Sequence, residues 1–130
     1  MLTRLQVRNY VLIDSLDVDF PEGLIIITGQ TGAGKSILLG ALSLVTGAKA
    51  DAGMISDGAD NCVVEAEFDV DPSDASLKAE LEENDVEWDE GHLIVRRVVN
   101  RSGRSRAFVN DSPVSVQILQ DISSRLIDIH

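Results

Sequence analysis

Residues Gly29-Gln30-Thr31-Gly32-Ala33-Gly34-Lys35-Ser36 match the phosphate-binding pattern G-x-x-x-x-G-K-[ST]. Glycines in such a loop let successive backbone N–H groups turn toward phosphate oxygens. The lysine ammonium can reach the β and γ phosphates, and the serine hydroxyl can ligate the Mg²⁺ that bridges them. We therefore predict a nucleoside triphosphate site, with Lys35 as its catalytic residue and Ser36 as its metal ligand.

The segments on either side of this loop support that interpretation. Leu24 to Thr28 is a continuous apolar, β-rich run, as expected of a parallel strand buried on both faces. The run from Ile37 to Val45 has the composition of a helix. Such a helix directs its partially positive N-terminus at the phosphates, so the predicted site extends to Ile37. A glycine turn without a ligand is the alternative, and these flanks disfavour it.

Length and composition limit the classes of protein to be considered. The chain has 130 residues, of which 44% are hydrophobic, enough for the core of one domain. No apolar stretch approaches the ~20 residues that span a bilayer, and the N-terminus lacks a secretory pattern. We expect a cytoplasmic protein without a membrane partner. The single cysteine, Cys62, lies in an alternating run and is expected to be a buried thiol.

Charge is unevenly distributed along the chain, whose net charge is −11. Between Asp57 and Glu90 lie 14 of the 22 acidic residues, with Lys78 as the one basic residue. We expect this acidic block to form a solvated surface, with docking of a protein as the lesser alternative. A cluster of five arginines follows it: Arg96, Arg97, Arg101, Arg104 and Arg106.

Hydrophobic periodicity and turn residues predict further elements around the loop. Two strands precede it, and after its helix Gly47 ends the helical run. A strand, a helix, a hairpin and a last helix follow. The expected strands are Leu2–Arg8, Val11–Phe20, Cys62–Val70, Leu93–Val99 and Ser105–Val109, and the later helices are Ser73–Asn84 and Ser115–Arg125.

Four stretches together resemble the RecN family, which is grouped with the SMC and RecF-like ATPases. They are Leu5–Tyr10 with Ile13-Asp14, the loop Thr28–Ser36, the segment Gly47–Asp51, and Arg104-Ser105 through Val109-Asn110. The similarity extends over essentially all of the chain. Its end, Leu126–His130, resembles the strand that leads into the glutamine-containing Q-loop of that family.

The resemblance implies an α/β fold, a P-loop NTPase that forms the N-terminal half of an ABC-type head. Its mixed sheet would have antiparallel strands flanking the P-loop strand and helix. Residues 1–130 would be an incomplete N-terminal lobe, with the Q-loop, signature motif and Walker B carboxylate expected beyond residue 130. The C-terminal lobe would be one partner and a second copy of the head another, with ATP and Mg²⁺ between the two heads.

In such a family, ATP binding brings heads together and hydrolysis releases them, in the service of recombinational repair of double-strand breaks. The resemblance therefore implies an ATPase that acts on double-stranded DNA near the nucleoid, although the lobe alone would hydrolyse ATP poorly or not at all. It also places Arg8 and Asn9 near the phosphate or base of the nucleotide. An Asx-type turn, with Tyr10 packed over the core, is the alternative. Lys49 and Ser56 lie near the position where related heads carry a sensing arginine, and Ser56 is not basic.

Within the arginine cluster, Arg104 and Arg106 would share one strand face, whereas Arg96 and Arg97 would point to opposite faces. Arg104 and Arg106 are therefore the candidates for DNA contact. The alternative is a solvated hairpin whose guanidinium groups pair with the acidic block.

Two further alternatives concern the reaction. An apolar strand that ends in Asp128 has the form of a second Mg²⁺ ligand, but the run is short and a structural role is favoured. The alternatives for the whole chain are a small-molecule P-loop kinase and the ATPase subunit of a transporter. Two strands before the loop disfavour the kinase, and the RecN-like residues disfavour the transporter.

Overall fold

The computed structural model describes residues 2–20, 32–87 and 91–126, with side chains from residue 37 onward in the second range. Six strands form one sheet in the order β2-β1-β3-β4-β5-β6, and every neighbouring pair is antiparallel. The strands are β1 (Leu2–Tyr10), β2 (Ile13–Asp19), β3 (Asn61–Asp69), β4 (His92–Asn100), β5 (Ser105–Val109) and β6 (Ser112–Val114).

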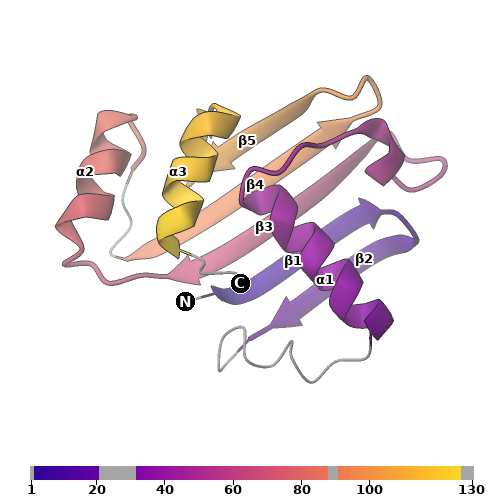
Figure 1. Ribbon diagram of the computed structural model, residues 1–130, viewed down its shortest axis with the longest axis horizontal. Coiled ribbons are helices and arrows are strands. Elements are labelled where there is room, and N and C mark those ends of the chain that lie inside the picture. The colour runs from indigo at the N-terminus through magenta and orange to yellow at the C-terminus, as the bar shows by residue number, and fades with distance from the viewer. Residues whose placement is uncertain (1, 21–31, 88–90, 127–130) are drawn as a thin grey trace.

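Helices cover one face of this sheet. The helices are α1 (Gly32–Val45), α2 (Ala75–Glu83) and α3 (Val116–Leu126), with a short 3-10 helix η2 (Ala52–Met54). α1 lies across β3 and β4, α3 lies against β5, and α2 packs beside α3 at the end of the molecule (Figure 1). In the part of the chain that the structure describes, no helix combines the length and apolar character needed to cross a membrane.

Strict alternation along the strands separates a helix-covered face from a helix-free face. On β3, Val64, Ala66 and Phe68 are buried, whereas the intervening Glu65 and Glu67 are half-buried on the opposite side. Side chains of a strand point alternately to opposite faces. The buried apolar residues therefore contact the helices, and the residues between them lie on the opposite face of the sheet. The core consequently lies between the sheet and the helices.

Local side-chain caps explain where two helices begin. The Asp74 carboxylate accepts from the backbone N–H of Leu77 at 3.1 Å, and the Ser115 hydroxyl oxygen accepts from the N–H of Ile118 at 3.1 Å. Each cap satisfies a backbone donor that the first turn of the helix leaves without a partner. α2 buries Leu77 and Leu81, and α3 buries Leu119 and Ile122.

The predicted elements are largely confirmed, with shifted ends. The strand expected from Val11 begins at Ile13, because Val11 lies in the β1–β2 turn with a positive φ of 51°. The helix predicted from Ile37 begins earlier, at Gly32 inside the loop motif. The short β6 was not predicted, since its sequence Ser112-Pro113-Val114 contains a proline. The predicted strand Leu24–Thr28, which would supply the parallel pairing, lies outside the described residues.

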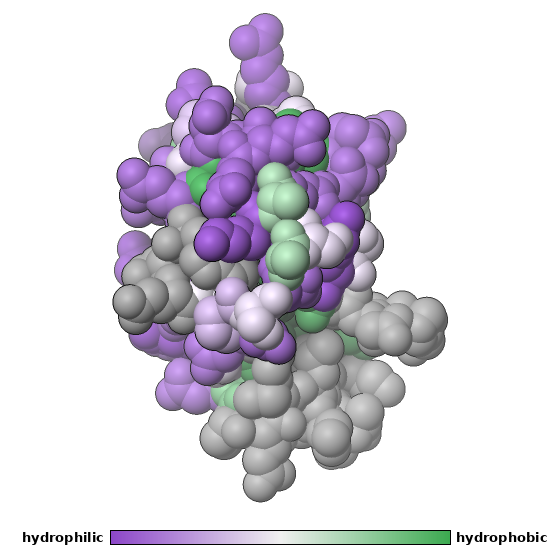
Figure 2. Space-filling view, turned by 90° about the vertical axis from the view of Figure 1, so that its left-hand side faces the viewer, coloured by the Kyte–Doolittle hydropathy of each residue, from purple (hydrophilic) through white to green (hydrophobic). Residues whose placement is uncertain are grey.

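Two composition-based predictions can be compared directly with the fold. Cys62 is fully buried, and burial raises the pKa of its thiol to about 11, so the expected inert thiol is confirmed. The helix of the acidic block, α2, forms an end of the molecule whose surface is predominantly hydrophilic (Figure 2). Glu82, Glu83 and Asp85 are exposed there, as a solvated surface requires.

Gly47 ends α1 in a conformation that other residues rarely adopt. Its φ is +98°, and a Cβ atom there would lie 3.3 Å from Cβ of Gln120 and closer still to Cγ. The left-handed backbone and the close approach of α3 both favour glycine at this position.

We expect Gly47→Ala to lower the free energy of unfolding by about 2–4 kcal/mol, because backbone strain and overpacking act together. Gly58→Ala is the matched control, since Gly58 has a φ of +82° but no atom within 4 Å of the added Cβ. Urea unfolding of both variants separates the cost of backbone strain from the cost of the contact with Gln120. Equal losses in the two variants would show that contact with Gln120 contributes nothing.

Candidate functional site

The N-terminal end of α1 carries the second half of the glycine-rich motif. Gly32, Ala33, Gly34, Lys35 and Ser36 are the first five residues of this 14-residue helix. Gly29, Gln30 and Thr31 lie outside the described residues, as do the side chains of Lys35 and Ser36. The first turn contains no acidic residue that would neutralise the partial positive charge of the helix end. This helix terminus therefore has the electrostatic character that an anionic ligand requires.

The β1–β2 turn packs against the middle of α1. Asn9 has a positive φ of 56°, which interrupts the alternation of β1 just before Tyr10. The Tyr10 hydroxyl lies beside Gly40 of α1, where an added Cβ would be 2.5 Å from it. Tyr10 also packs on the hydrophobic core, and burial raises the pKa of its hydroxyl. The packing of Tyr10 over the core, predicted as an alternative, is present.

Ser56 connects the β1–β2 turn to the segment that follows α1 through hydrogen bonds. Its hydroxyl donates to the carbonyl of Val11 at 2.7 Å and lies 3.3 Å from that of Ile13. Its backbone N–H donates to the carbonyl of Asn9 at 2.9 Å. Ser56 is only 7% exposed, so these bonds are shielded from water. Ser56, which lies near the expected position of a sensing arginine, therefore holds the β1–β2 turn in this structure.

The structure does not bring Arg8 to α1. Arg8 follows the buried Val7 on β1 and is exposed on the helix-free face, where it lines a hollow with Gln6, Val63 and Glu65. α1 lies on the other face of the sheet (Figure 1). Asn9, one residue later, lies in the turn itself.

The arginine cluster divides between the two faces, as alternation predicts. Arg97 is 2% exposed and points to the helices, so its expected place in a solvated hairpin is wrong. Its Nη1 donates to the carbonyls of Leu44 and Ala48 at 2.8 and 2.9 Å. Burial lowers the pKa of Arg97, although an arginine stays protonated near neutral pH. The site prediction did not include this residue.

Arg96 points the other way and is held by neighbours on the helix-free face. Its Nη1 lies 3.9 Å from Glu65 and 3.4 Å from Asp111, and its guanidinium stacks 4.6 Å from the centre of the Phe108 ring. Glu65 belongs to the acidic block, so the predicted pairing of the hairpin with that block is present for Arg96. These pairs are partly open to solvent, so each contributes little stability.

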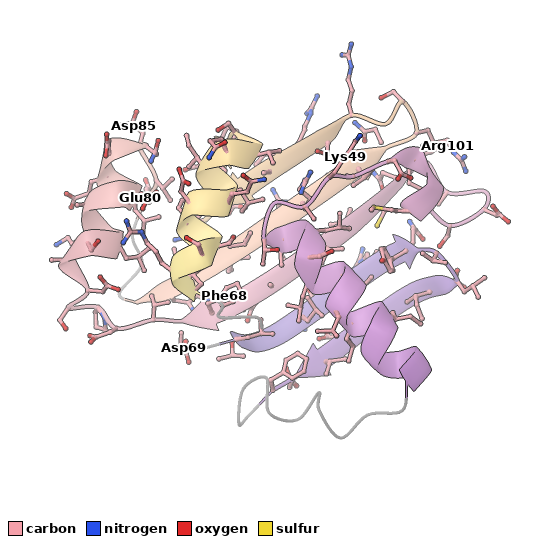
Figure 3. The ribbon with its side chains drawn as sticks, viewed as in Figure 1. Lys49, Phe68, Asp69, Glu80, Asp85 and Arg101 are labelled. Atoms are coloured by element: carbon pink, nitrogen blue, oxygen red, sulfur yellow. The ribbon has the colours of Figure 1, made fainter. Side chains whose placement is uncertain are left out.

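Arg104 and Arg106 are exposed, and among the described residues neither forms an ion pair. Arg101 lies at the tip of the same β4–β5 hairpin (Figure 3). The strand registers place Arg106 opposite Val98, Val98 opposite Val63, and Val63 opposite Arg8. Arg8 and Arg106 are thus at the two ends of one row across four strands of the helix-free face.

Surface hollows lie along this row of residues. One is lined by Val63, Val98, Arg106 and Phe108, among others, and the hollow beside Arg8 shares Val63 with it. We call the exposed Arg8, Arg101, Arg104 and Arg106 with the valines between them the basic row. In this row Val63 and Val98 lie between Arg8 and Arg106.

Two remaining candidates are placed differently. Lys49 is exposed near the C-terminal end of α1 (Figure 3). Asp128, considered as a second metal ligand, lies outside the described residues. In the described part of the chain, no three His, Cys, Asp or Glu side chains are grouped as a metal site.

Comparison with known proteins identifies relatives along the entire chain. The profile of the AAA domain family matches residues 4–130. A DNA repair protein RecN of Vibrio cholerae is 38% identical over 130 residues, covering 100% of this chain and 23% of the relative. A DNA repair protein RecN of Streptomyces coelicolor is 36% identical over 126 residues, covering 97% and 22%. The chain thus spans about a quarter of the length of these relatives.

Solved structures share the fold at low sequence identity. One, from work on ATP-driven dimerization and DNA-stimulated activation of SMC ATPases, superposes with a TM-score of 0.70 at 22% identity, covering 95% of this chain and 77% of its own. A structure of the recombination mediator protein RecF with a bound ATP analogue gives a TM-score of 0.61 at 17% identity, covering 92% and 29%. The predicted fold class is confirmed.

Removing the Ser56 hydroxyl tests how firmly the β1–β2 turn is held. We expect Ser56→Ala to cost about 1 kcal/mol of folding stability, because the carbonyl of Val11 loses the hydroxyl donor of a buried serine. Amide exchange across residues 9–13 should accelerate. Ser124→Ala is the control, since Ser124 is exposed and, among the described residues, its hydroxyl bonds only to the carbonyl of Asp121 in the same helix. Equal stability and exchange in the two variants would contradict the role given to Ser56.

Proposed function

This chain belongs to the AAA domain family, and we propose that it is the ATP-binding lobe of a RecN-like ATPase that acts in recombinational repair of DNA double-strand breaks. The similarity to DNA repair proteins RecN over the whole chain supports the biological process. The SMC and RecF folds support the architecture of an ATPase head. Neither the kinase nor the transporter alternative is favoured by these relatives.

One observation carries the nucleotide site: α1 begins inside the glycine-rich motif and has no acid in its first turn. The backbone N–H groups at this end have no partner within the helix, so they are available to phosphate oxygens. Residues Gly29 to Ile37 would surround the phosphates of ATP. Lys35 would place its charge on the β and γ phosphates, and Ser36 would hold Mg²⁺, which neutralises charge that develops during phosphoryl transfer.

The expected contact of Arg8 with the nucleotide stays a prediction, since the described structure shows its side chain in a hollow with Gln6, Val63 and Glu65. Asn9 remains a candidate through its place in the β1–β2 turn beside α1. The catalytic base is not assigned to any residue of this chain. We propose that residues 1–130 are one lobe of a head and that a C-terminal lobe completes the hydrolytic site.

The proposed macromolecular partners are double-stranded DNA and a second copy of the head. Arg104 and Arg106 are exposed, free of ion pairs among the described residues, and directed toward solvent on one side of the hairpin. Cations so placed can displace condensed counterions from a phosphate backbone. Head association with bound ATP would couple nucleotide state to DNA. A cytoplasmic, nucleoid-associated location follows from DNA as the partner.

The nucleotide assignment is tested by calorimetric titration of Mg-ATP into the full-length protein and its Lys35→Ala variant. We expect binding to weaken by about 10- to 100-fold, because a charge-assisted contact to phosphate is lost. Lys78→Ala is the control, since Lys78 is an exposed lysine on α2. Unchanged affinity in the Lys35 variant would remove the loop from the site.

The DNA assignment is tested by the salt dependence of duplex binding. Replacing Arg104 and Arg106 by Ala in the full-length protein should weaken binding and lower the slope of log K against log salt by about two. The control is a double variant with Lys78→Ala and Arg125→Ala. It removes the same number of positive charges, but from the side of the molecule that carries the helices. If both double variants lose affinity alike, the effect is one of net charge and the hairpin is not a contact surface.

A further inference from the structure

The C-terminal end of α1 is closed by side chains from two other elements. Backbone carbonyls in the last turn of a helix have no partner within the helix. Here the carbonyl of Val45 accepts from the Ser123 hydroxyl at 2.9 Å, and that of Gly47 accepts from Gln120 Nε2 at 2.9 Å. Both donors belong to α3. The carbonyls of Leu44 and Ala48 accept from Arg97 of β4.

Arg97 joins α1 to the β4–β5 hairpin through a single buried group. Besides its bonds to the two carbonyls, its Nε and Nη2 donate to the hydroxyl of Ser105, at 3.2 and 2.9 Å. Ser105 is the first residue of β5. Among the described residues no carboxylate pairs with Arg97, so carbonyl and hydroxyl oxygens alone solvate its charge. Arg97 is also the largest of the fully buried side chains.

A buried cation of this kind has a cost that an apolar side chain would avoid. Desolvation of a guanidinium is unfavourable, and well-packed apolar replacements of buried charges are often neutral or stabilising. The arginine does offer what an apolar residue cannot. Its planar fork of donors can hold several oxygens in one fixed arrangement, and its charge complements the negative end of the α1 dipole.

We propose that Arg97 is a positioning residue of the nucleotide site. Its guanidinium fixes the C-terminal end of α1 to β4 and β5, and thereby sets the direction in which the opposite end presents the glycine-rich loop. This inference rests on the proposed nucleotide binding at that loop. Arg97 itself does not touch the ligand, since it lies at the far end of the helix.

The length of α1 explains why such a distant contact matters. A helix of 14 residues is about 21 Å long, so a tilt of about 3° at one end displaces the other by about 1 Å. Phosphate-binding N–H groups act within hydrogen-bond distance, where a displacement of this size weakens the contact substantially. Ser123 and Gln120 hold the same end from α3, whereas Arg97 holds it directly from the sheet.

The test compares Arg97→Met, Arg97→Lys and Leu81→Ala in the full-length protein. Leu81 is fully buried in α2, which does not contact α1 substantially, and its truncation supplies a control for lost stability. Urea unfolding gives the stability of each variant, and calorimetry gives its dissociation constant for Mg-ATP. We expect Arg97→Met to weaken ATP binding by about tenfold, as loss of one well-formed contact would. Arg97→Lys should recover part of that affinity, because lysine keeps the charge and can donate hydrogen bonds, although from a single nitrogen.

Leu81→Ala should bind ATP within about twofold of the unaltered protein even if it is less stable. Affinity that follows stability across all three variants would overturn the proposal, because Arg97 would then be merely structural. Amide exchange of residues 40–45 without nucleotide provides a second measurement. It should accelerate in Arg97→Met but not in Leu81→Ala.

These two measurements separate the failure of this inference from failure of the proposed function. If the unaltered protein does not bind Mg-ATP, the proposed nucleotide site is wrong, and amide exchange still shows whether Arg97 orients α1. If ATP binds but neither affinity nor exchange changes in Arg97→Met, the positioning role is wrong and the nucleotide site stands.

Discussion

A helix end buried in a protein must find partners for its terminal carbonyl groups, and this requirement links three elements of this chain. The C-terminal end of α1 is joined to α3 and β4 by hydrogen bonds to backbone carbonyl groups that have no partner within the helix. Arg97, Gln120 and Ser123 supply the missing donors. The same bonds join three elements that are distant in sequence, so α1, α3 and the β4–β5 hairpin are held in one arrangement. The orientation of the N-terminal end of α1 depends on that arrangement.

The sheet then separates two kinds of chemistry. Its helix-covered face carries α1 and, with it, the glycine-rich motif at one end of the helix. Its helix-free face carries the basic row, in which Arg8 and Arg106 stand on either side of Val63 and Val98. The sheet therefore has the helix that begins in the glycine-rich motif on one side and exposed arginines on the other. Arg97 and Arg96, adjacent in the chain, have opposite environments for this reason.

Much of this arrangement could be predicted from residue patterns. The loop motif, the alternating strands and the helical run after the loop are local features, and local features survive folding when they agree with one another. Alternation also predicted that Arg96 and Arg97 would point to opposite faces. Alternation did not show which of the two arginines would be buried, because β4 has apolar residues on both faces. Leu93 and Val95 lie on one face, and Ile94 and Val98 lie on the other. Arg97 is the buried one of the two, because the helices cover the face of the sheet on which its side chain lies.

The sequence by itself determined that a glycine-rich loop motif precedes a helix and where most strands and helices lie along the chain, since each depends on residues close in the chain. Tertiary structure alone decided that Arg8 faces away from α1 and that Ser56 holds the β1–β2 turn. It also decided that Arg97 is inside the core rather than on a solvated hairpin. These outcomes depend on which sheet face the helices cover and on hydrogen bonds between residues up to 78 positions apart, which no local pattern encodes.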